Sequence, residues 1–74
     1  MCIMVEVFKT NVTEQAQASW LVNLIHQYFI DHEANFDLLD CDNILRVKSL
    51  SGNINPSHLI LFMREQGYYA EVIV

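Results

Sequence analysis

The hydrophobic residues of this 74-residue chain change their spacing repeatedly, and the order of those changes constrains the fold more than any other feature. Over residues 3–7, β-branched residues alternate with other types, which is typical of a strand. From Trp20 to about His32, apolar residues recur at helical spacing. Asn11 or Thr13 is expected to cap this helix. The first half of the chain is therefore predicted to be one strand followed by one long amphipathic helix.

The next segment indicates a hairpin. Residues 36–38 and residues 45–47 each alternate apolar with polar side chains, as strands do. Residues 40–43 between them read Asp-Cys-Asp-Asn, which are residue types that favour a turn. We therefore predict two short antiparallel strands joined by this acidic turn.

The last third of the chain predicts a second helix and a final strand. Asn55 is a good helix cap, and Pro56 follows it at the position where proline is best tolerated. Apolar residues then repeat at helical spacing until Gly67, which is expected to end the helix. Residues 68–74 are rich in β-branched and aromatic types and are predicted to form the fourth strand.

This order of elements predicts an α+β fold: a ferredoxin-like βαββαβ domain over residues 1–74, with a four-stranded antiparallel sheet and both helices on one face. Alternation along the strands sorts their residues by face. The face expected beneath the helices is apolar throughout: Ile3, Val5, Val7, Phe36, Leu38, Leu45, Val47, Ala70 and Val72. The opposite face is mixed: Met4, Glu6, Phe8, Asp37, Leu39, Ile44, Arg46, Lys48, Tyr69, Glu71 and Ile73.

The opposite face is too apolar for contact with water alone, so we expect it to bind a second copy of the chain or a partner protein. The interface is predicted to contain six residues: Met4, Phe8, Leu39, Ile44, Tyr69 and Ile73. Glu6 or Glu71 would meet Arg46 or Lys48 across a two-fold axis. In the alternative interpretation, these charges pair across neighbouring strands of one monomer. Strand addition at the exposed edge of the second or the fourth predicted strand is a further route to association.

Charge and hydropathy exclude several classes of protein. Nine acidic residues against four basic ones give a net charge of −5, which leaves no basic patch for nucleic acid or for an anionic membrane surface. No apolar run approaches the ~20 residues that cross a bilayer, and the first residues do not resemble a signal peptide. We expect a cytoplasmic protein, in which Cys2 and Cys41 are free thiols.

Three segments resemble the heavy-metal-associated domain of copper chaperones and metal-transporting ATPases. They are Gly-Tyr-Tyr-Ala-Glu-Val at residues 67–72, Asn-Phe-Asp-Leu at 35–38 and Ile-Leu-Arg-Val at 44–47, and the resemblance extends over nearly the whole chain. It implies the same ferredoxin-like fold. In that family a Met-x-Cys-x-x-Cys loop after the first strand binds the metal through two thiolates. Residues 9–16 contain no cysteine here, so the resemblance supplies no metal ligand and we predict no cofactor.

Other metal ligands are conceivable outside the family's pattern. Cys2, His32 and His58 are expected at one end of the domain and would bind zinc if they converged, with Glu33 as a fourth ligand. Cys41 lies at the other end, between two aspartates. The alternative interpretation is that His32 and His58 only solvate helix ends and that Cys41 is an ordinary turn residue.

The sequence offers no catalytic group of residues. Cys41 is expected at the opposite end from His32 and His58, which prevents a nucleophile–base pair, and the carboxylates near it lie in an exposed turn. His26 is expected to be a surface residue outside any site. We therefore predict a non-enzymatic binding module that acts through protein contacts. The alternatives are a metal-ion carrier with ligands unlike the family's, and a small-ligand regulatory domain.

Overall fold

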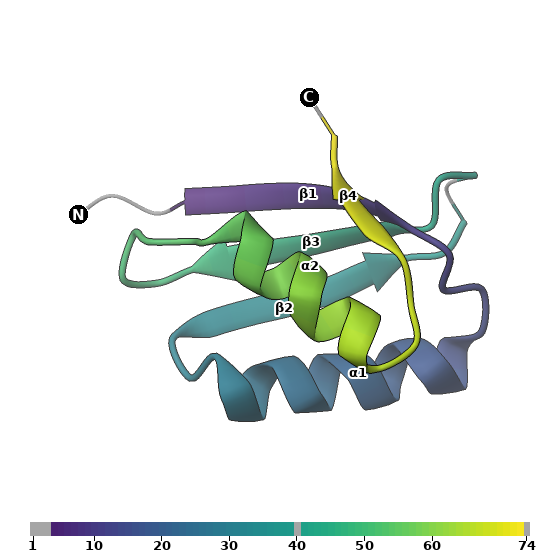
Figure 1. Ribbon diagram of the computed structural model, residues 1–74, viewed down its shortest axis with the longest axis horizontal. Helices are drawn as coiled ribbons and strands as arrows, with labels where there is room; N and C mark the ends of the chain where they lie inside the picture. Colours follow the sequence, from purple (N-terminus) through teal and green to yellow (C-terminus); the bar gives the residue numbers. More distant parts are fainter. Residues whose placement is uncertain (1–3, 40, 74) are drawn as a thin grey trace.

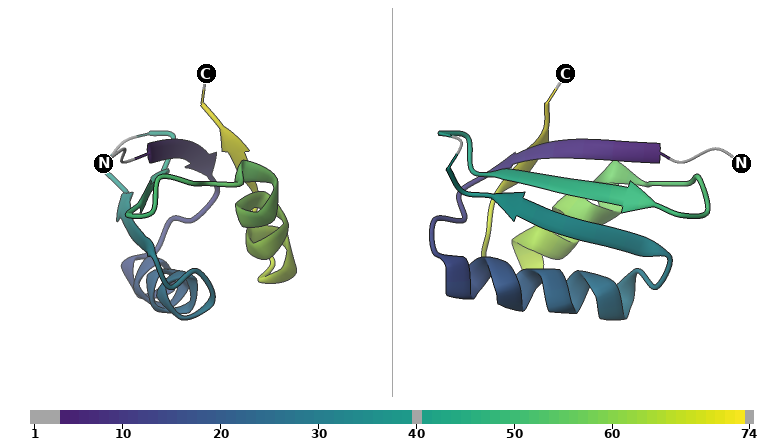
Figure 2. Two further views of the ribbon diagram at one scale, coloured as in Figure 1. Left: turned by 90° about the vertical axis from the view of Figure 1, so that its left-hand side faces the viewer. Right: turned by 180° about the vertical axis from the view of Figure 1, so that it is seen from behind.

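The computed structural model describes residues 4–39 and 41–73. Along this part of the chain the elements are β1 (Met4–Thr10), α1 (Gln15–Tyr28), β2 (His32–Asp37), β3 (Ile44–Ser49), α2 (Pro56–Glu65) and β4 (Ala70–Val72). The strands form one antiparallel sheet in the order β2-β3-β1-β4. Both helices lie on the same side of this sheet (Figures 1 and 2). The predicted ferredoxin-like α+β arrangement is confirmed.

Helix α1 does not begin where the sequence predicted. Its cap is Glu14, whose side chain makes no capping hydrogen bond, and the first helical residue is Gln15. The prediction that Asn11 or Thr13 caps this helix is wrong. Asn11 is used elsewhere, because its side-chain oxygen accepts a hydrogen bond from a backbone N–H near β4.

Helix α1 also ends earlier than predicted, at Tyr28 instead of about His32. The backbone N–H of His32 donates to the carbonyl oxygen of Phe29 at 2.9 Å, which closes a tight turn from the helix into β2. Ile30 lies in this turn and is 88% exposed. The apolar pattern continued through the turn, and for that reason it overstated the length of the helix.

Helix α2 matches its prediction at both ends. The side-chain oxygen of Asn55 accepts a hydrogen bond from the backbone N–H of His58 at 3.3 Å, and Pro56 is the first helical residue. After the helix, Gly67 has a φ of +91°, a left-handed conformation that costs glycine little. Local sequence therefore determines this helix.

Strand β1 presents the opposite faces from those predicted. Phe8 is completely buried, whereas Val5 is 55% exposed. The register explains the difference, because Phe8 lies opposite Leu45 and Glu6 lies opposite Val47 on β3. Directly opposed residues of neighbouring strands point to the same face, so Phe8 and Glu6 face the helices. The expected inward placement of Val5 and Val7, and the outward placement of Phe8 and Glu6, are wrong.

The core lies between the sheet and the two helices. Its buried members are Phe8, Val12, Ala18, Leu21, Ile25, Leu45, Val47, Leu59, Phe62, Met63 and Ala70. The predicted inward residues Phe36, Leu38 and Val72 pack against this cluster and are partly buried. Ile3 was also predicted to face inward, and it falls outside the described residues.

Two buried hydroxyl groups hold the loops at opposite ends of the sheet. Thr10 Oγ1 donates to the Asn43 carbonyl oxygen at 2.6 Å and accepts from the Val12 N–H at 3.2 Å. Ser49 Oγ lies 3.1 Å from the Ser51 hydroxyl and accepts from a backbone N–H in the loop that follows. These bonds satisfy the buried polar groups that the sheet encloses. Neither described helix is long and apolar enough to span a membrane.

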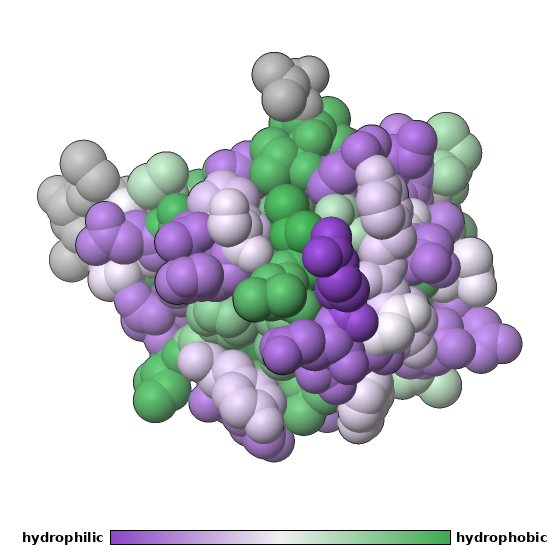
Figure 3. Space-filling view, viewed as in Figure 1, coloured by the Kyte–Doolittle hydropathy of each residue, from purple (hydrophilic) through white to green (hydrophobic). Residues whose placement is uncertain are grey.

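The helix side of the molecule also shows apolar groups. Figure 3 shows them as a green band that runs from the β4 end of the molecule downward across its middle. On α2, Leu61 is 52% exposed. The ring of Tyr28, which is 70% exposed, lies 5.7 Å from that of Phe62 and connects the two helices.

Candidate functional site: the exposed face of the sheet

We define the exposed face as the sheet surface that the helices leave uncovered. Alternation and strand register place eleven residues on it: Val5, Val7, Lys9, Glu33, Asn35, Asp37, Ile44, Arg46, Lys48, Glu71 and Ile73. Tyr69 comes directly before β4. Because it stands two residues before Glu71, alternation places it on the same face.

Aliphatic side chains form a strip through the middle of the exposed face. Val5 is 55% exposed and Val7 is half-buried on β1. Ile73, which is 41% exposed, lies beside Val7, because its backbone N–H donates to the Val7 carbonyl oxygen at 3.0 Å. Water therefore contacts a continuous apolar strip that folding leaves unburied.

Cationic side chains are concentrated beside this strip. Three of the four lysines and arginines of the chain lie on the exposed face: Lys9, Arg46 and Lys48. Lys9 Nζ is 3.9 Å from Asp42 Oδ1, whereas Arg46 and Lys48 form no ion pair with any described residue. The register places Glu33 next to Lys48, yet the two groups do not pair. The interpretation that charges of this face pair within one monomer therefore gains no support.

A hollow of about 330 Å³ lies between these cations and the aliphatic strip. It is lined by six residues: Val5, Glu33, Ala34, Asn35, Arg46 and Lys48. The guanidinium of Arg46, the ammonium of Lys48 and the amide of Asn35 are good donors to carboxylate oxygens, and Val5 supplies an apolar wall. Glu33 adds one carboxylate to the lining, so the hollow suits contact with a surface that is apolar and carries an acidic group next to Arg46 and Lys48.

Glu71 is held in place on the same face. The hydroxyl of Tyr69 donates a hydrogen bond to Glu71 Oε2. This bond to a carboxylate raises the pKa of Tyr69 above its ordinary value of 10.0, with a smaller contribution from desolvation. The bond orients the Glu71 carboxylate over β4, on the opposite side of β1 from Arg46 and Lys48.

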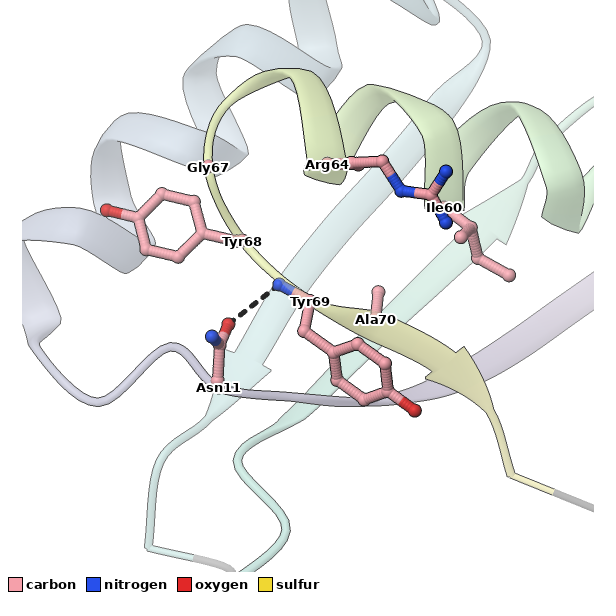
Figure 4. Close-up of a pocket in the computed structure, with 7 residues that line it drawn as sticks. All are labelled: Asn11, Ile60, Arg64, Gly67, Tyr68, Tyr69 and Ala70. Carbon is pink, nitrogen blue, oxygen red and sulfur yellow. Dashed lines mark hydrogen bonds between the residues drawn. The ribbon is translucent and has the colours of Figure 1, made fainter.

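A second hollow of about 330 Å³ lies where α2 leads into β4 (Figure 4). Asn11 Oδ1 accepts a hydrogen bond from the Tyr69 N–H at 2.8 Å and so ties the β1–α1 loop to this junction. In Figure 4 the Tyr68 ring points away from Tyr69 and Arg64. Arg64 is the only arginine, lysine, histidine, aspartate or glutamate among the described residues that line this hollow. The hollow is a structural junction and lacks the groups for acid–base chemistry.

The predicted interface residues do not form one patch. Tyr69 and Ile73 are exposed on the predicted face, and Ile44 is on that face but only 5% exposed. Met4 is 42% exposed and faces the helix side at the end of β1, while Leu39 is fully exposed in the β2–β3 turn. The sixth predicted member, Phe8, is in the core. Val5 and Val7 take its place on the exposed face.

The candidate metal ligands do not come together in the described part of the chain. His32 Nδ1 lies 2.8 Å from Asp31 Oδ1, and His58 is exposed at the start of α2. Cys41 is an exposed thiol in the β2–β3 turn. No three His, Cys, Asp or Glu side chains among residues 4–39 and 41–73 are placed to hold a metal ion. Cys2 lies outside the described residues.

His26 has a role that the sequence did not indicate. Its Nε2 accepts a hydrogen bond from the backbone N–H of Ala34 on β2, at 3.1 Å. A neutral imidazole that accepts at Nε2 carries its proton on Nδ1. No sequence motif marks this contact, because it depends on how closely α1 packs beside β2.

The exposed face has the chemistry of a contact surface. Its residues are aliphatic, aromatic, amide or charged, and none is a serine, cysteine or histidine that would serve as a nucleophile or base. No known protein family, no curated protein and no solved structure matches the chain. Function is therefore inferred from the side chains of the protein itself.

Proposed function

We propose that this protein is a small, non-enzymatic, cytoplasmic binding module that pairs with a second copy of itself through the exposed face. It would be a heavy-metal-associated-like domain that acts through protein contacts and has lost the metal-binding loop. One observation carries the proposal. An exposed aliphatic strip lies beside Arg46 and Lys48, which have no acidic partner within the described chain although the protein has nine acidic residues.

A two-fold arrangement would match both features of this face. The two-fold axis would lie between the two sheets and run parallel to β1. Because β3 and β4 flank β1 on opposite sides, rotation about this axis would place β3 of one copy over β4 of the other. The strips of Val5, Val7 and Ile73 would meet at the centre. Arg46 of each copy would face the partner strand that carries Glu71. Glu6 has no part in this arrangement, because it faces the helices.

A stable dimer interface would have to bury a large share of the exposed face, because the protein is small. Stable interfaces bury roughly 800 Å² per partner, which is about a sixth of the 4735 Å² that this protein exposes. The molecule measures 34 × 25 × 19 Å, so an interface of that area would take most of one broad side. Burial of the strip would supply the main stabilisation, and the charges would fix the orientation.

Sedimentation velocity over a range of concentrations tests the proposal. We expect the wild type to shift from monomer to dimer as concentration rises and Val5→Glu to remain monomeric, because a carboxylate would be placed in the centre of the interface. Leu61→Glu is the matched control, since Leu61 is 52% exposed on α2 and should leave the dimer intact. A wild type that is monomeric at every concentration would disprove the pairing.

A charge exchange tests the orientation. Arg46→Glu and Glu71→Arg should each weaken the dimer through like-charge contact, and the double variant should recover most of the lost affinity. If the double variant loses as much dimer stability as the two single variants lose together, Arg46 does not face Glu71 and the two-fold arrangement is wrong.

A further inference from the structure

Strand β2 has an edge that no other strand covers, because it is the outermost strand next to β3 (Figure 2). The carbonyl oxygen of Asp31 accepts from the Leu50 N–H at 2.8 Å, so the odd-numbered residues of β2 direct their backbone groups toward β3. Ala34 and Phe36 direct theirs away from β3. The bond from the Ala34 N–H to His26 confirms that direction.

Backbone groups at this edge remain open to a partner. The Ala34 N–H is already bonded to His26, but the Ala34 carbonyl and both backbone groups of Phe36 have no hydrogen-bond partner within the described chain. Such groups are a template for another strand. His26 marks one end of the open stretch, which continues toward the end of β2.

A groove of about 320 Å³ runs along the same edge, between β2 and α1. Its lining consists of Gln15, Ala18, Ser19, Val22 and Asn23 from α1 and Ala34, Asn35 and Phe36 from β2. None of these side chains is ionisable, although the chain has nine acidic and four basic residues. Gln15, Ser19 and Asn23 follow one another at four-residue intervals and give the helical wall a row of amide and hydroxyl groups.

We propose that this groove binds an extended segment of a partner protein, which adds to β2 as a fifth strand and carries basic side chains on every second residue. An added strand directs alternate side chains to the two sides of the sheet. Those on the α1 side would enter the uncharged groove. Those on the other side would lie one strand away from Glu33, Asn35 and Asp37 of β2, and two strands away from Lys48 and Arg46 of β3. Lysine or arginine is therefore favoured at these positions.

The same charges argue against a second copy of β2 as the occupant. Two β2 strands side by side would bring Glu33 and Asp37 of both copies together in a protein of net charge −5. The groove does not include the strip of Val5, Val7 and Ile73, although Ala34 and Asn35 line both the groove and the hollow on the exposed face. It is therefore a second binding site next to the proposed dimer interface, and its backbone groups are available without self-association.

Titration of isotope-labelled protein with a designed peptide, followed by NMR, tests this site. The probe is the capped hexapeptide Lys-Val-Lys-Ser-Lys-Val. We expect shift changes at Ala34, Phe36 and Ser19, together with slower hydrogen exchange of the Phe36 amide. A peptide with glutamate in place of lysine should not bind. A peptide N-methylated at every residue should not bind either, because it keeps the charges but donates no backbone hydrogen bond.

Three outcomes with these peptides would overturn the proposal. Equal binding of the N-methylated peptide would mean that charge attraction alone holds the probe, without strand addition. Shift changes confined to Val5 and Arg46 would place the peptide on the exposed face. No binding of the lysine peptide at millimolar concentration would also count against the site.

Matched variants separate the groove from the rest of the surface. Ser19→Trp fills the groove from an exposed position and should abolish peptide binding, whereas Ser57→Trp, exposed on α2, should leave it unchanged. Glu33→Lys should weaken binding of the lysine peptide and allow the glutamate peptide to bind. If Ser19→Trp instead abolishes self-association, the groove takes a strand of a second copy, and the assignment to a partner protein is wrong.

Discussion

The two faces of the sheet are built from the same strands, yet only one of them is closed. On the covered face, Phe8, Leu45 and Val47 are completely buried beneath the helices. On the exposed face, Val5 is 55% exposed beside Arg46 and Lys48, which form no ion pair within residues 4–39 and 41–73. Strand β1 carries hydrophobic residues on both faces, and folding completely buries Phe8 while it leaves Val5 exposed. Val5 and the half-buried Val7 remain available for a contact outside the monomer.

The largest expected difference between the faces is in the free energy of unfolding. Phe8→Ala should lower it by ~3–5 kcal/mol, because it opens a cavity in the core. Val5→Ala should change it by about 0.5 kcal/mol or less, as surface substitutions do. Urea denaturation at a concentration where the protein is monomeric measures both. Similar losses for the two variants would contradict the assignment of the faces.

A smaller effect is expected where the covered face meets the turns. Thr10→Val should lower the free energy of unfolding by ~1–3 kcal/mol, because it leaves the Asn43 carbonyl and the Val12 N–H without their buried partner. Thr13→Val is the matched control, since Thr13 is exposed before α1. Equal stability of the two variants in urea would show that the Thr10 hydroxyl does not join β1 to the turn.

The smallest effect is expected on the exposed face itself. Because the pKa of Tyr69 is raised in the folded protein, its contribution to stability is complete below pH 10.0, the ordinary pKa, and is lost as the pH rises through the higher folded value. Glu71→Ala should remove the shift. Ultraviolet titration of the three tyrosines should then show one hydroxyl ionising at lower pH than in the wild type. An unchanged titration curve would show that Glu71 does not hold Tyr69.

The two helices differ in how well they could be predicted. For α2, the cap Asn55, the following Pro56 and the terminal Gly67 each act locally, and all three positions are confirmed. For α1, Glu14 caps the helix without a side-chain bond. The turn at Ile30 also continues the helical pattern of apolar residues. The two ends of α1 depend on tertiary packing, so the residues around them carry no sequence pattern from which the ends could be predicted.

The residues of the candidate site also differ in how well the sequence predicted them. Arg46 and Lys48 were predicted on the exposed face because β3 alternates clearly between apolar and charged residues, and the structure places them there. Val5 was missed and Phe8 was assigned to the wrong face because Phe8 alternates in step with Glu6, which made the set that contains Phe8 the more polar of the two. Strand addition at a sheet edge was predicted, but the groove beside β2 was not, since His26 and Ala34 meet only when α1 packs beside β2.

The sequence by itself determined the order of strands and helices, the ends of α2 and the faces of β3, because periodicity and capping residues act over a few neighbouring positions. The tertiary structure decided which face of β1 is buried. Local alternation favoured burial of Val5 and Val7, because the other set contains Glu6. Pairing with β3 placed Phe8 next to Leu45 beneath the helices, and that register left Val5 and Val7 on the surface that we propose for binding.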